Sequence, residues 1–77
     1  MKKRRDTMQA LSNARAGESY TIKWMFGLPE VMEFLRSRHV EEGNTVRVIG
    51  QCRDSVIIGV GDIRLAIGSD VAERIKV

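Results

Sequence analysis

The chain has 77 residues, 43% of them hydrophobic and 30% charged, and thirteen Lys and Arg against ten Asp and Glu give a net charge of +3. A domain of this size buries only about 60% of its unfolded surface, which leaves little room for a deep substrate cavity. One cysteine excludes an internal disulfide, and no apolar run approaches the ~20 residues of a membrane-spanning helix. A cytoplasmic protein is therefore expected.

The basic residues are concentrated near the N-terminus, where residues 2–5 are KKRR. Without this run, the chain has nine basic and ten acidic side chains and is close to neutral. Terminal segments are usually unstructured unless contacts hold them. We therefore expect residues 1–7 to form a basic, disordered tail and residues 8–77 to form a single domain.

The first half of the domain predicts a short helical turn at residues 8–11 and then a strand at residues 18–25. In the strand Tyr20, Ile22 and Trp24 alternate with Thr21, Lys23 and Met25. This period of two is typical of a half-buried strand, so the first three side chains are expected to point into the core.

A helix is predicted next, from Pro29 to about Arg38, because proline is favoured at the first helical position. Its apolar stripe is made of Leu28, Val31, Met32 and Leu35. A helix this short is marginal alone, so the stripe is expected to pack against the sheet.

The second half predicts three more strands before a final turn and strand. Residues 45–51 alternate, and residues 56–67 fold into a hairpin at Gly61-Asp62, a pair that suits a type II′ turn. The hairpin is expected to bury six side chains on one face: Val56, Ile58, Val60, Ile63, Leu65 and Ile67. Its other face would carry Ile57 and Arg64, with Gly59 and Ala66 as small positions. Ser69 is expected to cap a short helical turn before a strand at residues 75–77.

Five short strands in about 60 residues predict a mainly β fold, a small and strongly bent barrel with one short helix after the first strand. Closure of the barrel would protect the edges of such short strands.

Catalytic chemistry is not indicated. His39 is the one histidine, Cys52 lies thirteen residues further along, and no third group is placed to orient such a pair. The chain has no phosphate-binding loop. His39, Glu41 and Glu42 are weak candidates for a divalent metal site, although a solvated helix end explains them more simply. We predict no tightly bound cofactor and no enzyme.

Binding to nucleic acid is also not favoured. Single-strand binders place exposed aromatic platforms among basic residues, and most of the four aromatic residues are expected in the core. By elimination, a partner-binding surface is predicted near Ile57 and Arg64 on the outer face of the hairpin, together with Arg38 and His39 at the helix end.

Three segments resemble the FeoA family, the small SH3-like proteins of bacterial ferrous iron transport. Residues 11–22 match its opening through Leu11, Gly17-Glu18-Ser19 and Ile22. Residues 34–49 match its helix, turn and strand, and residues 56–77 match its closing half. The family usually ends its helix with an apolar residue and a glycine, where this chain has Arg38 and His39.

The resemblance implies a five-stranded SH3-like barrel and a cytoplasmic accessory protein without a catalytic centre. It also implies a partner, the ferrous iron permease of FeoB type with its cytoplasmic GTP-binding region, and at most weak binding of Fe(II) or another divalent metal. The alternative is a metal-responsive regulatory accessory or a small nucleic-acid-binding barrel, because the same module is fused to iron-dependent repressors.

Overall fold

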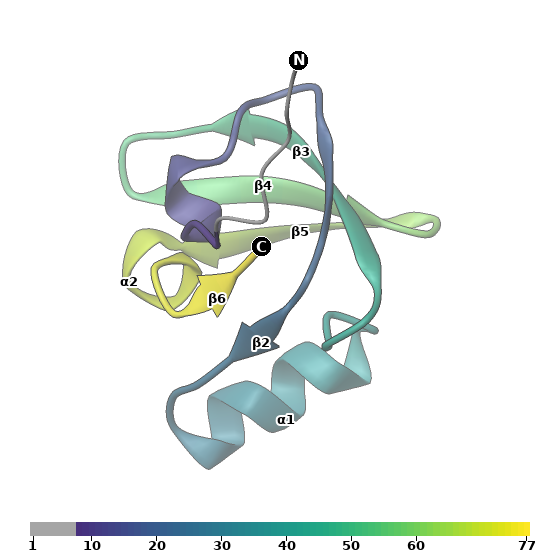
Figure 1. The fold of residues 1–77 in the computed structure, drawn as a ribbon, viewed down its shortest axis with the longest axis vertical. Helices are drawn as coiled ribbons and strands as arrows, with labels where there is room; N and C mark the ends of the chain where they lie inside the picture. Colours follow the sequence, from purple (N-terminus) through teal and green to yellow (C-terminus); the bar gives the residue numbers. More distant parts are fainter. Residues whose placement is uncertain (1–7) are drawn as a thin grey trace.

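The computed structural model describes residues 8–77 and is mainly β, with six strands in two antiparallel sheets (Figure 1). The predicted tail at residues 1–7 lies outside the described residues. Four strands form the larger sheet in the order β1-β3-β4-β5, and β2 and β6 form the smaller one. The strands are β1 Ser19–Thr21, β2 Trp24–Met25, β3 Thr45–Gln51, β4 Ser55–Val60, β5 Ile63–Gly68 and β6 Ile75–Lys76.

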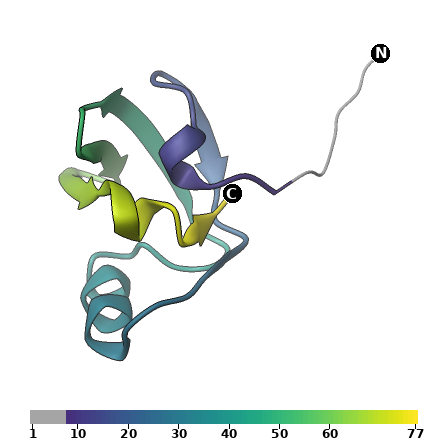
Figure 2. The same cartoon turned by 90° about the vertical axis from the view of Figure 1, so that its left-hand side faces the viewer.

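Three short helical elements complete the fold. A 3-10 turn, η1, covers Leu11–Asn13, the helix α1 covers Pro29–Ser37, and α2 covers Ser69–Ala72. The two views of the ribbon place α1 at one end of the molecule, beyond β2 and away from the centre of the four-stranded sheet (Figures 1 and 2). The C-terminal residue runs beside the first described residues, since the backbone of Gln9 and that of Val77 exchange two hydrogen bonds of 2.9 and 2.8 Å.

The prediction of one strand at residues 18–25 is wrong, because these residues form two strands in different sheets. The chain changes partner between two neighbouring residues: the N–H of Ile22 donates to Asn44 O at 2.9 Å, and that of Lys23 donates to Lys76 O at 2.7 Å. The alternation is lost at this point. Ile22 and Met25 are buried, whereas Trp24, expected inside, is 41% exposed.

The helix and the hairpin largely confirm their predictions. Pro29 is at the start of α1, and Met32 and Leu35 are buried beneath it. Leu28 is the exception: it precedes the first helical residue and is 64% exposed, so it does not belong to the buried stripe.

The hairpin has the predicted register, with Val60 opposite Ile63, Ile58 opposite Leu65 and Val56 opposite Ile67. Its inward face is buried except near the turn, where Ile63 extends past the edge of the core and is 39% exposed. Leu65 is half-buried. Ser69 is the first residue of α2 rather than its cap, which is Gly68.

One hydrophobic core joins both sheets, both helices and η1. It consists of buried aliphatic side chains and contains no aromatic ring: Leu11, Ala14, Ile22, Met25, Met32, Leu35, Val40, Val46, Val48, Val56, Ile58, Val60, Ile67, Ala72, Ile75 and Val77. This core accounts for nearly all the inward positions of the strands, so the inward face of the sheets is not available for binding.

Candidate functional site

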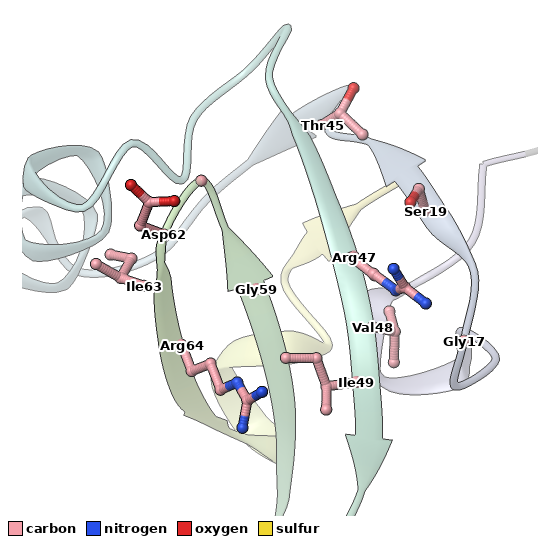
Figure 3. A pocket seen from close by; sticks show the side chains of 11 residues that line it. Gly17, Ser19, Thr45, Arg47, Val48, Ile49, Gly59, Asp62, Ile63 and Arg64 are labelled. Atoms are coloured by element: carbon pink, nitrogen blue, oxygen red, sulfur yellow. The ribbon is translucent and has the colours of Figure 1, made fainter.

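The outer face of the four-stranded sheet carries a groove of about 620 Å³, shown in Figure 3. Residues from β1, β3, β4, β5 and the turn between β4 and β5 line it: Gly17, Ser19, Thr45, Arg47, Val48, Ile49, Gly59, Gly61, Asp62, Ile63 and Arg64. We call this site the sheet groove. The lining includes hydroxyl, guanidinium and carboxylate groups, which can bind a ligand through hydrogen bonds and ion pairs.

Strand pairing places the two arginines of the sheet groove on either side of a glycine. Arg47 of β3 is opposite Gly59 of β4, and Gly59 is opposite Arg64 of β5. Neighbouring strands are about 4.8 Å apart, so the two arginine backbones are roughly 10 Å apart with no side chain on the strand between them. Both arginine side chains are exposed.

The apolar floor of the sheet groove comes from a bulge in β3. Val48 pairs with Ile58 and Gly50 pairs with Ile57, which leaves Ile49 as an extra residue without a partner. A bulge redirects the side chain that it inserts. Here Ile49 extends over Gly59, where an added Cβ would be only 3.2 Å from Ile49 Cδ1. The glycine therefore provides the space in which this isoleucine lies.

The four predicted partner-binding residues lie in two places. Arg64 lines the sheet groove, whereas Ile57 lies further along β4, half-buried between Gly50 and Ala66. Arg38 and His39 end α1 and do not line the groove. Arg38 covers the Phe34 ring, with its guanidinium carbon 5.2 Å from the ring centroid.

The three candidate metal ligands lie in the turn after α1 but do not form a ligand set. The Glu42 carboxylate is 3.8 Å from Arg36 Nη2, and the carbonyl of His39 accepts a hydrogen bond of 2.9 Å from Asn44 Nδ2. Within residues 8–77 no group of three or more His, Cys, Asp or Glu side chains is placed to hold a metal ion. The donors present at this turn do not fit a metal centre.

A second exposed surface contradicts the expectation that the aromatic residues belong to the core. Trp24 and Phe26 stack with their ring centroids 4.8 Å apart, and both are exposed. Beside them is a pocket of about 110 Å³, lined by Phe26, Gly27, Leu28, Val31, Met32, Asp70, Val71 and Arg74. The prediction failed because the backbone of residues 23–25 pairs with β6 instead of continuing beside β3.

Sequence reasoning missed Arg47 and Ile49 as site residues, although the signal was present. Their alternation with Val46 and Val48 places both on the outer face of β3. The missing information was the strand order. It places β4 between β3 and β5, so that Arg64 of β5 lies two strands away from β3. No feature of the sequence marks the bulge at Ile49.

A family model and a solved structure point to the same protein family. The model of the FeoA domain matches residues 9–77. The crystal structure of an iron uptake regulatory protein, FeoA, superposes with a TM-score of 0.81 and 27% identity, covering 91% of this chain and 95% of that chain. No curated protein sequence showed significant similarity.

Two further solved structures contain a similar fold. A manganese-dependent transcriptional repressor superposes with a TM-score of 0.82 at 18% identity, over 91% of this chain and 40% of that one. ScaR with bound Zn²⁺ gives 0.77 at 16% identity, over 88% of this chain and 35% of that one. The chain thus spans less than half the length of these two proteins, and at such identities the likeness concerns the SH3-like fold alone. Because the family model covers nearly all the described residues, we conclude that this chain belongs to the FeoA family.

Proposed function

We propose that this domain is a cytoplasmic accessory protein of ferrous iron transport that binds the GTP-binding region of a FeoB-type ferrous iron permease. The observation that carries the proposal is the match of the FeoA domain to residues 9–77, supported by the superposition on a FeoA crystal structure. No helix in residues 8–77 is long and apolar enough to cross a membrane.

The domain acts by binding rather than by catalysis. The sheet groove is open to solvent, and its lining carries no pair of nucleophile and base. Cys52 lies in the turn between β3 and β4, where its N–H donates to Ser55 O at 2.8 Å, whereas His39 lies at the end of α1. Iron is the cargo of the permease in this proposal, and the domain itself binds Fe(II) at most weakly.

The proposed contact surface is the outer face of the four-stranded sheet, including Arg64 and Ile57. This face combines exposed cationic groups with apolar side chains, which is the composition of many protein interfaces. Arg38 and His39 form the second-choice surface, because Arg38 on the Phe34 ring offers a similar combination at the helix end.

A second candidate function is a metal-responsive regulatory accessory. It is favoured by one observation, the superposition on part of a manganese-dependent transcriptional repressor and on part of ScaR with bound Zn²⁺. In that case the domain would bind a regulator instead of a permease. A nucleic-acid-binding barrel is less favoured, because residues 8–77 carry nine basic and nine acidic side chains and have no net charge.

An NMR titration of the isotope-labelled chain with the GTP-binding domain of the permease tests the proposal. We expect saturable chemical-shift changes on the outer face, and weaker binding of Arg64→Glu and Ile57→Asp. Arg53→Glu is the matched control, since Arg53 is exposed but outside the groove.

Equal binding of the parent and both folded variants would exclude the proposed face. If Ile57→Asp unfolds the domain, the binding of Arg64→Glu alone tests the sheet surface. The binding of Arg38→Glu then tests the surface at the helix end. No binding of the parent to the permease domain would overturn the function itself.

A further inference from the structure

The sheet groove has a charge pattern that the strand register imposes. Ser19 is opposite Arg47, Arg47 opposite Gly59, and Gly59 opposite Arg64, so these four residues form one row across the whole sheet. Within the row, the two guanidinium groups are on either side of a position without a side chain. Figure 3 shows Ile49 extending toward Gly59 in the space between Arg47 and Arg64.

Neither arginine has an acidic partner in the domain. Among residues 8–77 the only ion pair joins Arg36 to Glu42. The one carboxylate in the groove belongs to Asp62 at the hairpin turn, and it has no arginine nitrogen within 4.0 Å. In the part of the chain that the structure describes, neither guanidinium group is thus held in an ion pair, and paired N–H donors of arginine match the two oxygens of a carboxylate.

The floor between the arginines is apolar. Ile49 and Ile63 both line the sheet groove and are 40% and 39% exposed. A ligand that satisfies the whole groove needs anionic groups at its sides and apolar atoms between them, such as the methylene groups of two glutamate side chains that face the groove. Alternate side chains of an extended segment point the same way and are about 6.7 Å apart, which is within reach of two flexible arginines whose backbones are roughly 10 Å apart.

We propose that the sheet groove binds a short acidic segment of the protein partner, in which two carboxylates pair with Arg47 and Arg64 and apolar atoms cover Ile49. This inference rests on the proposed adapter function and adds the chemistry that the partner must present. The charge of the domain favours an acidic peptide over nucleic acid, because residues 8–77 are neutral as a whole and the groove offers a continuous chain of phosphates only two guanidinium groups.

The test uses a seven-residue peptide with Glu-Leu-Glu between Gly and Ser ends, titrated into the isotope-labelled full chain at low salt. We expect shifts confined to the amides of the groove, reduced by added NaCl because exposed ion pairs are screened. Arg47→Gln and Arg64→Gln should each weaken binding roughly three- to fivefold. Asp62→Asn should strengthen it, and Arg53→Gln should bind as the parent does.

Three outcomes would overturn the inference. The first is that the matched Gln-Leu-Gln peptide binds as well as the acidic one. The second is that Arg53→Gln weakens binding as much as Arg47→Gln, which would indicate net charge rather than a site. The third is that a twelve-nucleotide oligothymidine occupies the groove more tightly than the peptide does, which would favour nucleic acid.

The same titration with the permease's GTP-binding domain separates this inference from the proposed function. If that domain binds but leaves the groove amides unshifted and is not displaced by the peptide, the groove assignment is wrong and the adapter function stands. If the acidic peptide binds the groove and the permease domain does not bind at all, the groove chemistry stands and the partner is wrong.

Discussion

The helix α1 ends with a hydrogen bond of 2.9 Å from the N–H of Val40 to the carbonyl of Leu35. The N–H of His39 also donates back, to Arg36 O at 3.0 Å. These two bonds form a Schellman motif, and its apolar contact is provided by Val40 and Leu35, both buried. The motif requires a left-handed residue between them, and His39 has a φ of 67°.

The left-handed histidine predicts a stabilising substitution. A residue with a Cβ costs about 1 kcal/mol or more in this conformation, whereas glycine adopts it freely. His39→Gly should therefore raise the free energy of unfolding by about 0.5–1 kcal/mol in urea titrations with an unchanged m-value. Arg38→Gly is the control: Arg38 has a φ of −102°, so glycine there should lower stability. A loss of stability in His39→Gly would contradict the assigned conformation.

The hairpin turn allows a comparison of two glycines that differ in backbone conformation. An added Cβ meets no atom within 4 Å at either Gly61 or Gly50, but only Gly61 has a positive φ, of 58°. Gly61→Ala should lower the free energy of unfolding by about 1 kcal/mol or more, and Gly50→Ala should be neutral or slightly stabilising. Chemical denaturation of the two variants measures the difference, and equal effects would show that the turn imposes no left-handed residue.

Two isoleucines on the predicted inward face of the hairpin should differ strongly in their contribution to stability. Ile58 is completely buried, whereas Ile63 is beyond the edge of the core. Ile58→Ala should cost about 2–5 kcal/mol through lost burial and the cavity left behind. Ile63→Ala removes the same atoms from a partly exposed site and should cost less than about 1 kcal/mol. Thermal and urea unfolding would measure both, and a similar loss at the two positions would mean that the core extends to the turn.

Metal binding by the domain is predicted to be weak. Calorimetric titration with Zn²⁺, or with Fe²⁺ under anaerobic conditions, should give no stoichiometric binding with a dissociation constant below about 1 μM at neutral pH, because carboxylate and imidazole donors do not converge anywhere in residues 8–77. His39→Ala should leave the heat of titration unchanged. A tight site lost in that variant would instead place a metal at the end of α1.

Local sequence patterns determined most of the secondary structure and the register of the hairpin. Residues 45–48 alternate, residues 45–51 form β3 with the predicted bounds, and Pro29 begins α1 as proline does at first helical positions. The Gly61-Asp62 turn fixes which residues of β4 and β5 face each other, because a slip of one residue would move every apolar side chain to the solvent face. The family resemblance depended on the same spacing of apolar and glycine positions.

Tertiary structure alone decided where the first predicted strand divides and which surface residues meet. The change of partner from β3 to β6 at Ile22 and Lys23 depends on contacts with residues more than 20 positions away, so the local alternation could not place Trp24 on the surface. The sheet groove has the same origin. Arg47 and Arg64 are brought to either side of Gly59 by the order of three strands, and a bulge directs Ile49 between them. A period of two gives the face of a side chain, whereas its neighbours on that face follow from long-range pairing.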